Sequence, residues 1–260
     1  MVYFVSKIKY LGIKIMEKKL RNFVITGATA ESGQHLCKYI AKDAGSRMVM
    51  ISRSHNDELD ALRNKNIKYF SGIDLTRFDK EKGLIKDIDR HFRKPFGLVH
   101  MAGDFWEHET FDKINPKQAM DLMKSQFGTL YSTVYGLLDT MVKKGGGKIL
   151  TLGDNSTYMN LPNMAAFTAS KAAVEHFIKC IANEYMRNNI QANVLTVSSL
   201  KTEKNKTTKP NGDFENYISL DDLSREIVQT LQLGKTITGS VIRAVNYSPT
   251  YNELGALARI

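Results

Sequence analysis

An α/β fold built on one doubly wound parallel sheet is the architecture that this sequence predicts. Three observations predict it: short apolar runs alternate with helical stretches, most of these runs are almost uninterrupted, and no linker divides the chain. Uninterrupted apolar runs are typical of parallel strands that helices cover on both faces. The 260 residues are enough for one large domain with a full core.

The elements are expected in an alternating order. The first strand, at residues 21–26, is followed by a helix at residues 31–43 that turns Leu36, Ile40 and Ala41 inward. Further strands are expected at residues 47–52, 66–71, 97–102, 148–152 and 190–197. Two long helices are expected at about residues 116–144 and 164–188, the first with proline near its start and glycines at its end.

Residues 1–20 are expected to form an extension that precedes a single domain at residues 21–260. Phe4, Ile8, Leu11 and Ile15 share one helical face, so a weak membrane-surface or partner-binding helix is one interpretation. We favour the other, an over-long start, with the true beginning at Met16. Lysines interrupt this stretch, so neither a secretory signal nor a membrane span is expected.

The formal charge of +10 is unevenly spread, because the first 21 residues carry six basic side chains and one acidic one. The remainder is typical of a lysine-rich solvated surface. No basic stripe with interleaved aromatic residues is present, so a nucleic-acid partner is not expected. Cys37 and Cys180 are isolated, which predicts neither a disulfide framework nor a metal site and fits a cytoplasmic location.

A glycine-containing loop, Thr-Gly-Ala-Thr-Ala-Glu-Ser-Gly, occupies residues 26–33 after the first strand. Glycines in such a loop let the backbone approach a pyrophosphate at a helix N-terminus. Two registers are open: Glu31 replaces the middle glycine of TGxxxGxG, or Ala30 replaces that of TGxxGxxG. Glu31 would repel phosphates if it faced them, but not if it pointed outward. A plain strand-to-helix turn is the alternative.

Other motifs accompany this loop. Asp74-Leu75-Thr76 follows the third strand, Ala102-Gly103 follows the fourth, and Phe167 and Lys171 stand four residues apart on a helix. Together they resemble the short-chain dehydrogenase/reductase family over about residues 21–245, in particular its 3-oxoacyl-ACP reductase-like and dihydropteridine-reductase-like single-domain branch. The resemblance implies a Rossmann-type fold, a nicotinamide cofactor, a small-molecule substrate and a homo-oligomer, either a dimer or a tetramer.

The resemblance also implies the residues that hold the cofactor: Gly27, Thr29, Ala30, Ser32, Gly33, Arg53, Asp74, Leu75, Ala102, Gly103, Lys171 and Thr202. An arginine after the second strand, with no acid beside it, favours the 2′-phosphate of NADP(H) over NAD(H). NAD(H) is the alternative cofactor, and none is expected if the pocket is vestigial. His100 is expected to be a structural substitute for the family's asparagine.

The catalytic positions depart from the family. Its tyrosine transfers a proton, its lysine tunes the tyrosine pKa, its serine holds the substrate and its asparagine orders a water chain. Here these positions are Phe167, Lys171, Asp154 and Ser125. Asp154 is expected to pair with Lys171, and Phe167 to face a polar pocket. Tyr158 is a weaker candidate for a substitute donor.

Three functions remain open on this basis. The first, which we favour, is a redox-impaired family member that keeps the fold and the NADP(H) site for binding or assembly. The second is an active oxidoreductase on a carbonyl, quinone or pterin-like substrate, with Asp154 or Tyr158 as donor. The third is a non-redox lyase, isomerase or cyclase that uses Asp154 and Lys171 as an acid/base pair.

Overall fold

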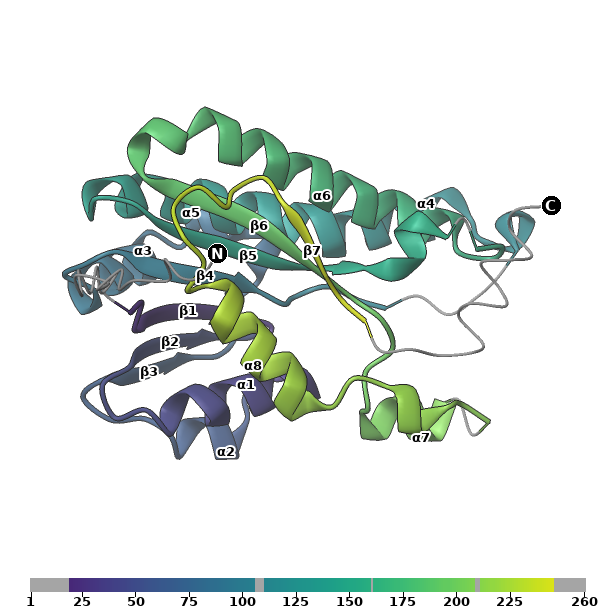
Figure 1. Cartoon of the computed structure of the whole chain (residues 1–260), viewed down its shortest axis with the longest axis horizontal. Coiled ribbons are helices and arrows are strands. Elements are labelled where there is room, and N and C mark those ends of the chain that lie inside the picture. Colours follow the sequence, from purple (N-terminus) through teal and green to yellow (C-terminus); the bar gives the residue numbers. More distant parts are fainter. Residues whose placement is uncertain (1–18, 106–109, 160, 209–210, 246–260) are drawn as a thin grey trace, which may run out of the picture.

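Seven parallel strands form one sheet in the computed structural model, which describes residues 19–105, 110–159, 161–208 and 211–245. The strand order is β3-β2-β1-β4-β5-β6-β7, so the chain winds outward from β1 in one direction and from β4 in the other (Figure 1). The strands are β1 (Asn22–Thr26), β2 (Arg47–Ile51), β3 (Ile67–Phe70), β4 (Phe96–His100), β5 (Gly147–Asp154), β6 (Ile190–Val197) and β7 (Val241–Ala244). The predicted doubly wound parallel sheet is confirmed.

Helices cover both faces of the sheet (Figure 1). One face carries α1 (Glu31–Ala41), α2 (Asp57–Asp60) and α8 (Leu220–Thr230). The other carries α3 (Lys82–His91), α4 (Pro116–Met123), α5 (Thr129–Lys143) and α6 (Ala165–Glu184). The short α7 (Glu203–Thr208) lies beyond the sheet, next to the start of α8 in the chain.

The core is two apolar layers, one on each side of the sheet. Successive side chains of β1 point to opposite faces of the sheet and so contribute to both layers. Val24 packs on the side of α3, α5 and α6, whereas Phe23 and Ile25 pack on the side of α1 and α8. All three side chains are at most 2% exposed. Burial of both faces explains why the strands are uninterrupted apolar runs rather than alternating ones.

The expected helix at residues 116–144 is divided. A π-helical turn, Lys124–Gly128, separates α4 from α5 and adds a residue to that turn. The pattern did not predict α3 and α8, whose narrow apolar stripes lie among charged residues. Cys37 is buried in α1 and Cys180 is exposed on α6, so the two cysteines are free.

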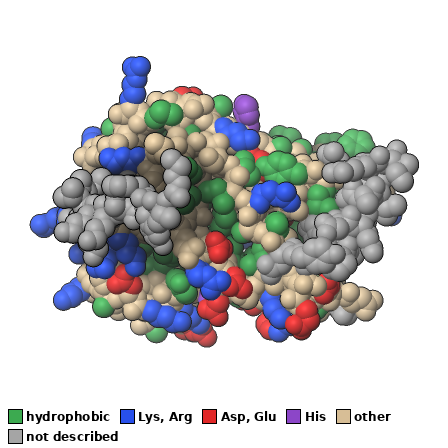
Figure 2. Space-filling model, viewed as in Figure 1, with side chains coloured by type: hydrophobic (Ala, Val, Ile, Leu, Met, Phe, Trp, Pro, Cys, Tyr) green, Lys and Arg blue, Asp and Glu red, His purple; other side chains and the backbone are tan. Residues whose placement is uncertain are grey.

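The expectations for residues 1–18 lie outside the described residues. Within the described ranges, no helix has the length and apolarity that crossing a bilayer requires. On the face seen in Figure 2, acidic side chains lie among the basic ones rather than leaving a single basic stripe.

Candidate functional site

A cleft of about 620 Å³ opens at the carboxyl ends of the strands, where the winding direction reverses between β1 and β4. Ligands of open α/β sheets bind at this switch point. The cleft brings together nine residues predicted from the sequence: Gly27, Thr29, Ala30, Arg53, Asp74, Leu75, Ala102, Gly103 and Ser125. Lys171 lines a small adjoining cavity that shares Ala102 and Gly103 with the cleft.

The glycine loop is shaped for close backbone approach. Gly27 has φ +70°, and a Cβ there would lie 2.7 Å from the Ala102 amide nitrogen. A Cβ on Gly33 would lie 2.3 Å from the Gly27 carbonyl oxygen. Both positions therefore require glycine. The loop packs closely against the backbone that follows β4, which leaves room for a phosphate group on the cleft side of the loop. Gly33 supports the loop from inside α1 and does not line the cleft, and neither does Ser32.

The structure decides the register of this loop. Ala30 is extended and precedes α1, whereas Glu31 is the first residue of the helix. Both carboxylate oxygens of Glu31 accept from the Glu203 backbone N–H, at 2.9 and 3.1 Å. Glu31 thus points outward to the start of α7, which favours the register with Ala30 at the middle glycine position.

The end of β2 offers polar groups to a ribose substituent. Arg53 is exposed, and the Ser54 hydroxyl lies 3.3 Å from that of Thr29. Lys124, which sequence reasoning missed, adds a second cation to the cleft. Its proximity helps to lower the pKa of Asp74, although the largest cause is the hydrogen bond from the Thr76 hydroxyl.

Thr202 does not line the cleft. Its hydroxyl accepts from the Asn205 backbone N–H at 3.1 Å and so caps α7. The structure therefore gives Thr202 an anchoring contact at the start of α7, one residue before the Glu203 amide that Glu31 holds.

His100 is a buried structural side chain, as the sequence predicts. One ring nitrogen lies 2.9 Å from the Thr26 hydroxyl and the other 3.2 Å from that of Thr129. Burial, and then the charge of Lys171, lower its pKa to about 3, against a hydrogen bond at Ala102. The imidazole is therefore neutral and links β1 to β4 and α5.

The expectation that Phe167 faces a polar pocket is wrong. The ring is 3% exposed and belongs to an apolar cluster with Leu122 and Met164. It meets the Phe105 ring edge-on, with centroids 5.3 Å apart, and the Lys171 ammonium lies 5.7 Å from its centroid. The structure thus places an apolar ring at the position where the resemblance implies a proton donor.

The expected ion pair between Asp154 and Lys171 is not formed within the described part of the chain. The Lys171 ammonium donates to the Leu152 carbonyl oxygen at 3.1 Å, while Asp154 accepts from the Ser156 backbone N–H at 2.9 Å. Asp154 acts on Lys171 at longer range only. Burial lowers the pKa of Lys171, and the charges of Asp154 and Glu175 oppose that shift.

Tyr158 turns its hydroxyl inward, where it donates to Glu175. Burial, followed by the hydrogen bond and the charge of Glu175, raises its pKa to about 12. A phenol with a raised pKa, already donating to a carboxylate, is a poor proton donor to a substrate. Glu175 was not predicted, although its spacing of four residues after Lys171 puts both on one helical face.

Ser125 bonds to a residue that sequence reasoning also missed. Its hydroxyl donates to the Asp104 carboxylate at 2.8 Å and accepts from the Asp104 backbone N–H at 2.7 Å. The π-helical turn at Lys124–Gly128 sets this position, since Ser125 is its second residue. Ser125 therefore ties the helix to the loop after β4.

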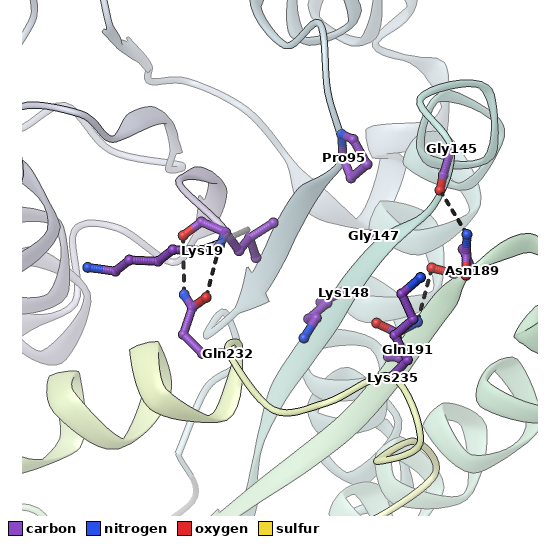
Figure 3. Close-up of a pocket in the computed structure, with 10 residues that line it drawn as sticks. Lys19, Pro95, Gly145, Gly147, Lys148, Asn189, Gln191, Gln232 and Lys235 are labelled. Atoms are coloured by element: carbon purple, nitrogen blue, oxygen red, sulfur yellow. Dashed lines mark hydrogen bonds between the residues drawn. The ribbon is translucent and has the colours of Figure 1, made fainter. Parts of the chain in front are cut away.

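A second pocket, of about 580 Å³, lies at the opposite, amino end of the sheet (Figure 3). Its polar groups bond within the chain: Gln232 exchanges hydrogen bonds with the Leu20 backbone at 2.9 and 3.1 Å. Gln191 likewise donates to the Asn189 carbonyl oxygen at 3.2 Å. These contacts tie the segment after α8 to the segment before β1 and hold the start of β6, so the carboxyl-edge cleft is the stronger candidate. Among the described residues, no cluster of side chains suits a metal ion.

The chain belongs to the short chain dehydrogenase family, whose sequence model matches residues 21–213. This agrees with the cleft, the glycine loop and Lys171.

Solved structures share the fold, and the chain is similar in sequence to several relatives. The chain is 23% identical to dehydrogenase RED2 of Cochliobolus heterostrophus over 63% of its length, and 28% identical to inactive hydroxysteroid dehydrogenase-like protein 1 of Pongo abelii over 62%. It spans only 60% and 50% of the length of these two relatives. A tyrosine-to-phenylalanine variant of ElxO with NADPH bound superposes with TM-score 0.76 at 20% identity, covering 86% of this chain and 96% of ElxO.

Proposed function

We propose that this protein binds NADP(H) in the carboxyl-edge cleft and is impaired in the redox chemistry of its family. The observation that carries the proposal is the combination of a loop that keeps Gly27 and Gly33 with an apolar ring at Phe167. The chemistry that this cofactor supplies when bound is hydride transfer. A carbonyl acceptor then also needs a proton, and Phe167 has none to give.

The residues that would hold the cofactor fit it. Gly27 leaves backbone room for a pyrophosphate, and the outward turn of Glu31 removes a carboxylate from that position. Arg53 and Lys124 add positive charge to the cleft, which supports NADP(H) over NAD(H). Lys171 would face the nicotinamide ribose from the adjoining cavity.

One solved structure and one relative are consistent with this proposal. ElxO carries NADPH in a variant with phenylalanine in place of a tyrosine, and the relative from Pongo abelii is named as inactive. An active reductase that uses Tyr158 or Asp154 has less support. Both side chains are engaged, Tyr158 with Glu175 and Asp154 with Ser156. The same engagement of Asp154 counts against a non-redox acid/base pair with Lys171.

Calorimetric titration with NADPH and with NADH tests the proposal. We expect NADPH to bind at least about 10-fold more tightly, and Arg53→Glu to remove that preference, since it places a carboxylate against the 2′-phosphate. Arg63→Glu is the matched control, because Arg63 is exposed and bonds to Asp60 instead. Equal affinities for the two cofactors would contradict the NADP(H) assignment, and no binding of either would contradict the proposed function.

A carbonyl and quinone screen with NADPH completes the test. We expect turnover near the uncatalysed background for ordinary ketones, because general acid help is typically worth about 10²–10⁴-fold. Vigorous reduction by the unmodified protein would contradict the impairment.

A further inference from the structure

Glu175 is a buried carboxylate that the proposed function leaves unexplained. It is 5% exposed and lies on α6, one helical turn after Lys171. Burial of a carboxylate is expensive unless hydrogen bonds or opposite charges compensate it. Its surroundings therefore need a physical account.

The protein makes room for this carboxylate at Gly153 of β5. A Cβ at that position would lie 3.2 Å from Glu175 Oε1 and 2.6 Å from the Thr196 hydroxyl. One oxygen, Oε2, accepts the Tyr158 hydroxyl, and Oε1 has no hydrogen-bond partner within the described residues. The Thr196 hydroxyl is buried beside the same glycine. Three elements thus enclose one carboxylate, with one oxygen uncommitted.

Lys171 lies one turn before Glu175 on α6, and its ammonium bonds to the carbonyl oxygen of Leu152, the residue before Gly153 on β5. Groups that act on the Lys171 ammonium come from three elements: His100 on β4, Asp154 on β5 and Glu175 on α6. His100 is neutral, and Asp154 is bonded to the Ser156 backbone and hydroxyl. Glu175 and Asp154 both favour the charged form of Lys171 against its burial.

We propose that Glu175 is a positioning residue of the cofactor site, which keeps the Lys171 ammonium charged at the Leu152 carbonyl oxygen, with Tyr158 and Gly153 holding Glu175 in place. The role in cofactor binding rests on the proposed function, whereas the effect on Lys171 does not. With Phe167 in place of the tyrosine, Lys171 has no phenol to tune, and the charge that Glu175 maintains serves binding of the anionic cofactor.

The effect on Lys171 is measured in the free protein. Lysines are labelled by reductive methylation with ¹³C, the Lys171 resonance is assigned with Lys171→Met, and its pH midpoint is followed by NMR. We expect Glu175→Gln to lower that midpoint by about one pH unit, because a nearby opposite charge is lost. Glu184→Gln, an exposed change of the same kind on α6, is expected to leave it unchanged. An unchanged midpoint in Glu175→Gln would overturn the proposal.

Tyr158→Phe provides a second variant if Glu175→Gln does not fold. It removes the hydrogen bond that holds the Glu175 carboxylate in place, so we expect a smaller downward shift of the Lys171 midpoint. An upward shift or none would count against the proposal.

NADPH affinity against pH separates this inference from the proposed function. In Glu175→Gln, affinity is expected to fall at a pH about one unit lower than in the unmodified protein. Overlapping profiles, with the unmodified protein still binding NADPH, would remove the positioning role alone. An unmodified protein that binds no NADPH would remove the proposed function, while the NMR midpoint would still decide the effect on Lys171.

Discussion

The substitutions that we expect from the sequence at Phe167 and Asp154 act in opposite ways. Phe167 keeps the aromatic volume and loses the hydroxyl, and its ring is held by Phe105, Leu122 and Met164. Asp154 adds a charge, which is turned to the Ser156 backbone. The first change removes a proton donor, and the second moves a polar group away from the lysine.

Restoring both residues tests the assignment of these positions. We expect Phe167→Tyr with Asp154→Ser to raise NADPH-dependent reduction of an activated ketone by about 100-fold, since Lys171 then has a phenol to tune. Phe167→Tyr is expected to lower the free energy of unfolding by about 1 kcal/mol, because the hydroxyl enters apolar surroundings. Enzyme assays and denaturant unfolding measure the two effects.

Phe105→Tyr is the control, because it adds a hydroxyl to the neighbouring ring instead. No gain in ketone reduction, with NADPH binding intact, would show that the pocket is remodelled beyond Phe167 and Asp154. Loss of a native turnover in the double variant would instead favour a specialised enzyme that uses Asp154.

At the scale of elements, the start of α7 is fastened to the cofactor loop. Glu31 holds the Glu203 amide and Thr202 caps the same turn. A second link joins α1 to α8, where His35 lies 3.0 Å from the Ser224 hydroxyl. Glu31, which replaces a family glycine in one of the two registers, therefore connects α1 to α7.

We expect Glu31→Ala to increase hydrogen exchange at the Glu203 amide and along α7 by about 10-fold, because the amide loses its acceptor. Exchange followed by mass spectrometry measures this change. Glu58→Ala is the control, since Glu58 is exposed and pairs with Lys38, in the last turn of α1. Equal exchange in Glu31→Ala and the unmodified protein would mean that Thr202 alone anchors α7.

At the scale of the whole molecule, the buried His100 on β4 makes the free energy of unfolding depend on pH in the acid range. Its pKa of about 3 lies below the ordinary value of 6.5, so the unfolded chain binds one proton more between these values. The stability that this neutral histidine contributes is present above about pH 6.5 and is lost as the pH falls toward 3.

In the unmodified protein, His100 is expected to lower the unfolding free energy by about 1.4 kcal/mol for each pH unit below 6. We therefore expect His100→Asn to remove this part of the pH dependence. Denaturant unfolding at several pH values measures it. His176→Asn, an exposed change on α6, is expected to leave the slope unaltered. A slope in His100→Asn equal to that of the unmodified protein would contradict the neutral state of His100.

The face formed by α5 and α6 carries exposed aromatic rings. Tyr131 and Tyr135 are 49% and 64% exposed and stack with centroids 6.4 Å apart, and Tyr131 also meets Phe177 across the two helices. Exposed aromatic clusters are typical of protein interfaces. We propose this face as the contact of the expected homo-oligomer.

Light scattering at micromolar concentration tests this contact. The unmodified protein is expected to be a dimer or tetramer. Tyr131→Arg with Tyr135→Arg is expected to convert a tetramer into dimers, or a dimer into monomers, because charge is poorly tolerated in an interface core. Ile237→Arg, in the loop before β7, serves as the control. A monomeric unmodified protein would contradict the prediction.

The sequence by itself determined the sheet, its winding and the family, because uninterrupted apolar runs and glycine spacing are local consequences of burial on both faces and of close backbone approach. The resemblance to the family also indicated nine residues that the structure brings together in one cleft. The missing hydroxyl at Phe167 and the stand-in role of His100 followed from single positions. These properties need no knowledge of distant contacts.

Only the tertiary structure decided how the altered side chains are engaged. The direction of Glu31 depends on Glu203, which is 172 residues away in the chain, and the burial of Phe167 depends on Leu122 of another helix. The direction of the Tyr158 hydroxyl became clear only from the structure, which places the Glu175 carboxylate beside Gly153 and within hydrogen-bond reach of Tyr158. Each outcome is set by which acceptor, charge or apolar surface folding brings within reach, and sequence spacing carries no record of that.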